Sequence, residues 1–84
     1  LKILSAPNQD ISLTVTESAI LETIFRFFPH IASRQQITRN IFDRTNKITS
    51  AQTLNVRLSE LRKKLGIHSS HLEAIPNSGL RWKE

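Results

Sequence analysis

Four leucines in the segment 53–66, "TLNVRLSELRKKLG", constrain the fold more than any other feature of the sequence. Leu54, Leu58, Leu61 and Leu65 recur at alternating intervals of four and three residues, which places them on one face of an α-helix. Gly66 follows the last of them and is a residue type that commonly ends helices. The segment therefore predicts a helix over residues 50–65 whose leucine face packs on a core.

Two earlier segments carry similar signals of an amphipathic helix. In a capping box, a Ser or Thr side chain and a Glu or Gln three residues later satisfy free backbone groups at a helix start. Three such boxes precede the apolar segments: Thr14-x-x-Glu17, Ser33-x-x-Gln36 and Thr49-x-x-Gln52. We therefore predict helices over 15–28 and 34–43 in addition to 50–65.

Short extended segments flank the three helices. Residues 1–4 and 11–15 are predicted strands joined by a turn through "SAPNQD", and residues 71–75 and 80–84 flank "PNSG", which suits a hairpin. The expected order is two strands, three helices and two strands. With 84 residues and no linker-like or repeated segment, we expect 1–84 to be one α+β domain.

Composition narrows the function classes. The chain has no Cys, so disulfides and thiolate metal sites are excluded, and we expect a cytoplasmic protein. No apolar run approaches the roughly 20 residues of a membrane span, and the first residues lack the order of a signal peptide. We find no catalytic motif and expect no enzyme and no cofactor. His68 and His71 lack a third ligand, so we expect no metal site.

Charge is unevenly distributed along the chain. Residues 1–32 carry two basic and three acidic side chains, whereas residues 33–84 carry ten basic and four acidic ones. A basic region of this kind is typical of phosphate binding, although a solvated surface helix also produces it. Charge alone leaves both interpretations open.

The order and spacing of four motifs resemble the winged helix-turn-helix DNA-binding domain of OmpR/PhoB-type bacterial response regulators. The motifs are "LTVTESAIL" at 13–21, "SRQQI" at 33–37, "TLNVRLSELRKKLG" at 53–66 and "EAIPNSGLRW" at 73–82. The resemblance implies short N-terminal β-strands, a three-helix bundle and a C-terminal β-hairpin wing. Helix 34–43 would support helix 50–65, which enters the major groove, and wing 72–83 would lie near the minor groove.

The same resemblance implies sequence-specific binding of double-stranded DNA by a bacterial transcription regulator. The chain would be the C-terminal part of a longer protein, dimerising on repeated half-sites through a receiver domain or on DNA, and the loop 44–49 would contact RNA polymerase. The alternative is a winged-helix protein-interaction module without DNA binding. An RNA-binding domain is disfavoured because few aromatic residues are available.

Helical geometry and the resemblance select the same face for DNA. Stepping 100° per residue from Leu54 turns Gln52, Val56, Ser59, Glu60 and Lys63 outward, flanked by Thr53, Asn55, Arg57 and Arg62. By resemblance, phosphates would be met by Gln52, Thr53, Arg57, Ser59 and Arg62. Bases would be approached by Val56 and Glu60.

Two of these residues have alternative explanations. Val56 suits a thymine methyl group, but a single exposed apolar residue is also ordinary. Glu60 stands where the family often has Arg. Its carboxylate would either accept from cytosine N4 or form a salt bridge with Arg57 or Lys64 at helical spacing.

The wing departs from the family pattern as well. Pro76 occupies a position where many members have an Arg that enters the minor groove. Asn77 and Ser78 follow it and still offer donors to phosphate or to a minor-groove edge. Arg81 would replace the missing Arg only if its strand directed it toward DNA. Trp82 is expected to cap the core.

Overall fold

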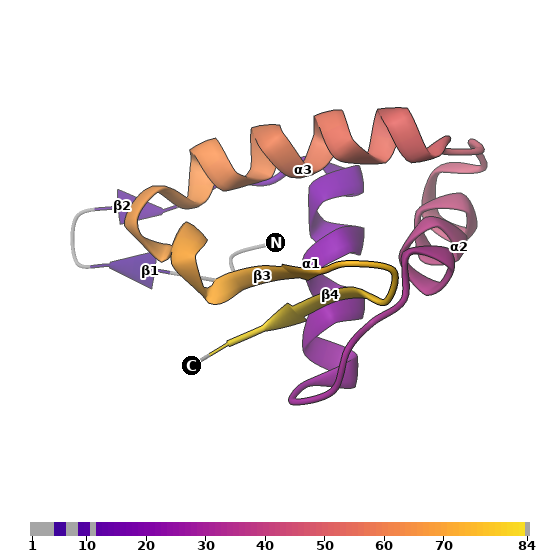
Figure 1. Cartoon of the computed structure of the whole chain (residues 1–84). Helices are drawn as coiled ribbons and strands as arrows, with labels where there is room; N and C mark the ends of the chain where they lie inside the picture. The colour runs from indigo at the N-terminus through magenta and orange to yellow at the C-terminus, as the bar shows by residue number, and fades with distance from the viewer. Residues whose placement is uncertain (1–4, 7–8, 11, 84) are drawn as a thin grey trace.

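Three helices and a β-hairpin make up most of the domain, as the computed structural model shows for residues 5–6, 9–10 and 12–83 (Figure 1). The helices are α1 (Val15–Phe27), α2 (Arg34–Thr45) and α3 (Ala51–Leu65), followed by the 3₁₀ helix η1 (Gly66–His71) and the strands β3 (Leu72–Ile75) and β4 (Gly79–Trp82). Within the described residues, no helix has the length and apolar character needed to cross a bilayer. The α+β winged-helix prediction is confirmed.

Capping boxes start the first two helices as predicted. The Thr14 hydroxyl accepts from the Glu17 backbone N–H at 3.2 Å, and the Glu17 carboxylate accepts from the Thr14 N–H at 2.9 Å. Ser33 and Gln36 repeat this arrangement at the start of α2. Both starts are therefore encoded locally, by residues three positions apart.

The predicted box at the start of the third helix is wrong by one residue. The N-cap is Ser50, whose hydroxyl accepts from the Thr53 N–H at 3.1 Å. Thr49 lies outside the helix. The residue three positions after Ser50 is Thr53, which has no carboxylate or amide oxygen that could accept from the Ser50 N–H, as Gln52 would have accepted from Thr49. The leucine face is unaffected, because the shift moves only the helix start.

The helix ends differ slightly from the prediction. α1 ends at Phe27 because the residue before Pro29 is disfavoured in helical conformation. α2 runs two residues farther than expected, to Thr45, and is capped by Asn46, whose backbone is left-handed (φ 58°). α3 ends before Gly66 (φ 57°), as predicted, but the chain then continues as η1.

The N-terminal strands are shorter and placed differently than expected. β1 (Ser5–Ala6) pairs with β2 (Gln9–Asp10) in antiparallel fashion, within the segment predicted to be only a turn. The prediction for residues 1–4 lies outside the described residues. The predicted strand at 11–15 is wrong where it is described, since 12–14 are not in a strand and the capping box at Thr14 draws Val15 into α1.

The core lies where the three helices and the hairpin meet. It contains the four leucines of α3 together with, among others, Ile20 and Ile24 of α1, Ile37 and Ile41 of α2, and Leu72 and Leu80 of the hairpin. The Trp82 ring packs edge-on against Phe25 with centroids 4.9 Å apart. Its predicted role as a cap on the core is confirmed.

Backbone hydrogen bonds attach the hairpin to the segment between α1 and α2. Leu80 donates to Ala32 O at 2.9 Å and accepts from the Ala32 N–H at 2.8 Å. Gly79 (φ 148°) lies directly beside this bridge, and a Cβ built there would overlap the Ala32 carbonyl and lie 2.8 Å from Ser33 Cα. Only glycine fits at this position.

We therefore expect Gly79→Ala to lower the free energy of unfolding by more than about 2 kcal/mol, because it adds a steric overlap to an unfavourable φ. Denaturant unfolding measures the change. Gly66→Ala is the matched control, since Gly66 also has a positive φ but nothing lies within 4 Å of its Cβ position. Equal losses in the two variants would contradict the close approach at Ala32.

Candidate nucleic-acid interface

The surface of α3 opposite its leucines forms the candidate site. We define the outer face of α3 as Gln52, Val56, Ser59, Glu60 and Lys63, all of which are exposed. Val56 is 50% exposed although it is apolar. α3 runs along the upper edge of the molecule in Figure 1, with the hairpin below it and no helix of the described residues above it. The geometry predicted for this face is thus present on an uncovered side of the domain.

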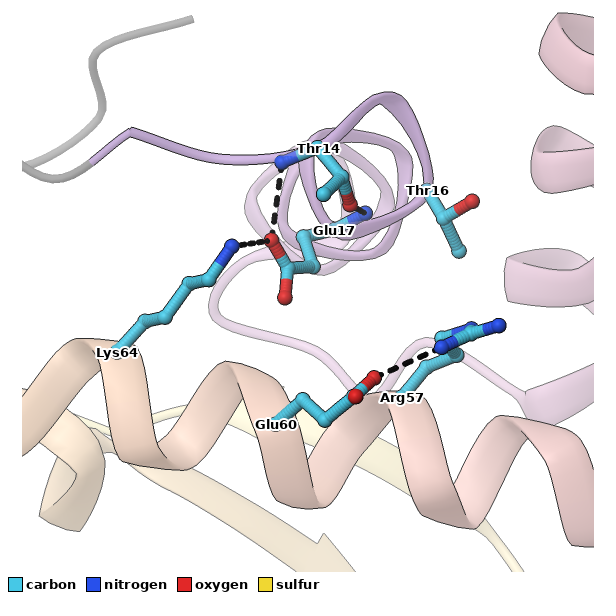
Figure 2. A pocket seen from close by; sticks show the side chains of 6 residues that line it. All are labelled: Thr14, Thr16, Glu17, Arg57, Glu60 and Lys64. Carbon is cyan, nitrogen blue, oxygen red and sulfur yellow. Dashed lines mark hydrogen bonds and ion pairs between the residues drawn. The ribbon is translucent and has the colours of Figure 1, made fainter.

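One flank of α3 faces the start of α1 across a polar cleft (Figure 2). The cleft holds about 350 Å³ and is lined by Thr14, Thr16, Glu17, Arg57, Glu60 and Lys64. Within it, Arg57 Nη1 donates to Glu60 Oε1 at 2.9 Å, and both side chains are about half exposed. The alternative pairing of Glu60 with Lys64 is not the one formed, because Lys64 binds Glu17 instead.

The Glu17–Lys64 ion pair joins the first turn of α1 to the last turn of α3. Lys64 Nζ lies 2.7 Å from Glu17 Oε1, and the Glu17 side chain is only 4% exposed. Burial raises the pKa of this carboxyl, but the hydrogen bonds from Lys64 and Thr14 and the lysine charge outweigh burial and hold the pKa below its ordinary value of 4.5. The carboxylate is therefore charged at neutral pH and fixes α3 relative to α1.

The opposite flank of α3 is bound to α2 and to the hairpin. Arg34 Nη1 donates to Asn55 Oδ1 at 2.9 Å, which ties the start of α2 to the first half of α3. Arg62 Nη1 donates to the Leu72 carbonyl at 2.7 Å. Arg62 is only partly exposed, so its guanidinium is directed toward the wing rather than straight outward.

The hairpin turn presents the residues predicted for the wing. Pro76, Asn77 and Ser78 are exposed, and Asn77 adopts a left-handed backbone with φ 62°. Ser78 N–H donates to Ile75 O and closes the turn. Arg81 is held on the hairpin by Glu73, with its Nε 2.6 Å from Glu73 Oε1. Arg81 therefore pairs across the strands instead of extending as a substitute for the missing wing arginine.

All the residues predicted for the interface lie on two surface elements. Eight are on α3, namely Gln52, Thr53, Val56, Arg57, Ser59, Glu60, Arg62 and Lys63, and two are in the turn, Asn77 and Ser78. The sequence did not predict the hydrogen bond from Arg34 to Asn55 or the ion pair between Glu17 and Lys64. Both contacts join residues far apart in the sequence, and no local spacing signals them.

The two histidines take part in local packing. His71 stacks on Trp82 with centroids 5.2 Å apart, and its Nδ1 lies 2.6 Å from Lys83 O. His68 lies beside His71, with centroids 6.3 Å apart. In the part of the chain that the structure describes, no group of three or more His, Asp or Glu side chains is placed to hold a metal ion.

We expect the Glu17–Lys64 pair to make stability depend on pH. Because the folded pKa of Glu17 is lowered, its stabilisation is present above the ordinary pKa and is lost as pH falls through the lowered value. Glu17→Gln should cost about 1–3 kcal/mol at neutral pH, and the difference from wild type should vanish in acid. Denaturant unfolding across pH measures this.

Glu60→Gln, which removes an exposed pair in the same cleft, serves as the control and should cost less than about 1 kcal/mol. If the free energy of unfolding lost in Glu17→Gln stayed constant with pH, the Glu17 carboxylate would not be the source of the pH dependence.

A comparison with protein families matches residues 8–82 to the family described as "Transcriptional regulatory protein, C terminal". A comparison with curated protein sequences finds no match. The family match spans all three helices and the hairpin, so it includes every predicted interface residue. This family consists of regulatory DNA-binding domains and is not a family of enzymes. The chain belongs to the family of C-terminal, OmpR/PhoB-type effector domains of transcriptional regulatory proteins and is a DNA-binding winged-helix domain.

Proposed function

We propose that this domain binds double-stranded DNA sequence-specifically, as part of a bacterial transcription regulator. In this proposal α3 enters the major groove and the wing, residues 72–83, lies near the minor groove. The outer face of α3 is the observation that carries the proposal. It is a row of exposed side chains on a helix whose opposite side is fully buried, and such a helix fits the width of the major groove.

Val56 and Glu60 are the proposed base-reading residues. Half of the Val56 side chain is exposed, and burial against a thymine methyl would both remove it from water and favour that base. Glu60 uses one carboxylate oxygen for Arg57. Its other oxygen would accept from cytosine N4, while the salt bridge orients Arg57.

Phosphate contacts are proposed for the polar and basic residues around this pair. They are Gln52, Thr53, Arg57, Ser59, Arg62 and Lys63 on α3, with Asn77 and Ser78 in the turn of the wing. These side chains, all exposed except the partly buried Arg62, are donors of the types that commonly bind phosphate oxygens. Such contacts would hold α3 in register, while Val56 and Glu60 select the sequence.

The family match supports a proposal for the larger assembly. We propose that residues 1–84 are one domain of a longer cytoplasmic regulator, whose receiver domain, or DNA itself, brings two copies together on repeated half-sites. The loop 44–49 is the proposed contact with RNA polymerase, since Ile48 is 89% exposed and Phe42 is 43% exposed at the adjoining end of α2. The same apolar residues support the alternative, a protein-interaction module without DNA binding.

Salt dependence separates these two functions. For the DNA-binding domain, the logarithm of the association constant should fall linearly with the logarithm of salt concentration, by about 0.9 per phosphate neutralised. Arg57→Gln should weaken binding to all duplexes alike. Fluorescence anisotropy titrations over a range of salt concentrations measure both effects. Negligible affinity, or a flat slope with selected DNA, would favour the protein-interaction module.

Site selection from random duplexes tests base reading by Glu60. We expect Glu60→Ala to relax the preference at a single base pair, which would carry cytosine in the wild-type motif and discriminates by about 1–3 kcal/mol. Asp43→Ala removes the same charge from an exposed position on α2 and should leave the motif intact. If the motif stays the same in Glu60→Ala while all affinities change together, Glu60 only orients Arg57.

A further inference from the structure

We infer that Arg62 is a positioning residue that sets the angle of the wing relative to α3. This inference rests on the proposed DNA-binding function and assigns Arg62 a role different from a simple phosphate contact. Among the described residues, the Arg62 guanidinium links α3 to the wing through a 2.7 Å hydrogen bond from Nη1 to Leu72 O. The helix that would read the major groove and the strand that would lead to the minor groove are thus joined directly.

The pattern of the hairpin explains why Leu72 O needs a donor from outside the hairpin. Leu72 pairs with Trp82 and Ala74 with Leu80, while Lys83 N–H donates to His71 O. Since hydrogen-bonded and non-hydrogen-bonded pairs alternate in an antiparallel ladder, Leu72 and Trp82 form a non-hydrogen-bonded pair. The Leu72 carbonyl therefore points away from β4, toward α3.

The two outer edges of the hairpin are held in different ways. On β4, the outward N–H and C=O of Leu80 bond to the backbone of Ala32. On β3, the outward carbonyl of Leu72 bonds to the Arg62 side chain, and the Leu72 N–H donates to Ser69 O in η1. The β4 edge is held by backbone hydrogen bonds alone, whereas the β3 edge is joined to α3 by one side chain, that of Arg62.

Neighbouring residues on α3 clarify the direction of Arg62. Lys63, the next residue, is exposed on the outer face, whereas Arg62 is partly buried on the flank beside the hairpin. A guanidinium holds its donors in one plane, so the bond from Nη1 to the Leu72 carbonyl restricts the directions in which the remaining N–H groups can point. Arg62 therefore already binds the wing in the absence of DNA.

Loss of Arg62 should therefore act on DNA binding through the wing. Leu72 O, which is part-buried at this bond, would lose its charged donor, and the β3 edge would be free to shift relative to α3. Contacts made by Asn77 and Ser78 at the far end of the hairpin would weaken. Contacts made by the outer face of α3 would remain.

The test compares Arg62→Gln with Lys63→Gln, adjacent substitutions that each remove one positive charge. Binding is measured on two duplexes that carry the site selected by the wild-type protein. One duplex extends through the flank whose minor groove the bound protein protects from hydroxyl radicals, and the other ends before that flank. Thermal unfolding of both variants checks that they remain folded.

We expect Arg62→Gln to lose about threefold to tenfold in affinity on the long duplex, the worth of one or two net hydrogen bonds, and much less on the short one. Its salt slope should stay near the wild-type value. Lys63→Gln should lose affinity equally on both duplexes and lower the slope by about 0.9. Combining Arg62→Gln with Asn77→Ala should cost less than the sum of the separate losses.

Equal losses of Arg62→Gln on the two duplexes, with additive behaviour toward Asn77→Ala, would overturn the inference and make Arg62 an ordinary phosphate contact. Failure of the proposed function looks different. In that case the wild-type protein itself would select no motif and would show no salt-dependent binding to either duplex.

Discussion

Burial of four leucines on α3 is the constraint on which the rest of the structure depends. Leu54, Leu58, Leu61 and Leu65 are all within the core, and turning the helix by even one residue would expose part of this stripe to water at a cost of roughly 2 kcal/mol for each leucine affected. The helix therefore has one stable rotation about its axis. That rotation decides which residues form the outer face, so the same burial that stabilises the domain also selects the residues that we propose to contact DNA.

Polar contacts on both flanks of α3 fix its orientation more closely than hydrophobic burial alone. Burial fixes the rotation of α3 but permits small changes in its tilt, since apolar contacts are not directional. Glu17 binds Lys64 on one flank, while Asn55 and Arg62 on the other flank bind Arg34 of α2 and Leu72 of the hairpin. These directional contacts fix the positions of α3, α1 and the wing relative to one another. Such preorganisation lowers the cost of ordering the domain when it binds a duplex.

Local signals in the sequence account for the parts of the fold that were predicted. The helices followed from capping residues and apolar spacing. Helical spacing allowed Glu60 to pair with either Arg57 or Lys64, and the structure forms the pair with Arg57. The cap of α3 was placed one residue too early because Thr49 has a Gln three residues later, whereas Ser50, the actual N-cap, has Thr53. The pair between Glu17 and Lys64 joins residues far apart in the sequence, so no local pattern specifies it. β1 and β2 pair residues only three and five positions apart, but strands of two residues are too short to show an alternating apolar pattern. The site residues were accessible to prediction because they share one helix face, whereas the ties that hold this face were not.

Dimethyl sulfate probing of the bound duplex shows whether the outer face of α3 occupies the major groove. The reagent methylates guanine N7 in the major groove and adenine N3 in the minor groove, so one experiment reports on both. We expect protection of guanine N7 within the selected site, reduced when Val56 and Glu60 are both replaced by Ala, with adenine N3 protection confined to a flank beside the wing. Protection of adenine N3 alone, with every guanine N7 in the site still reactive, would contradict the placement of α3 in the major groove.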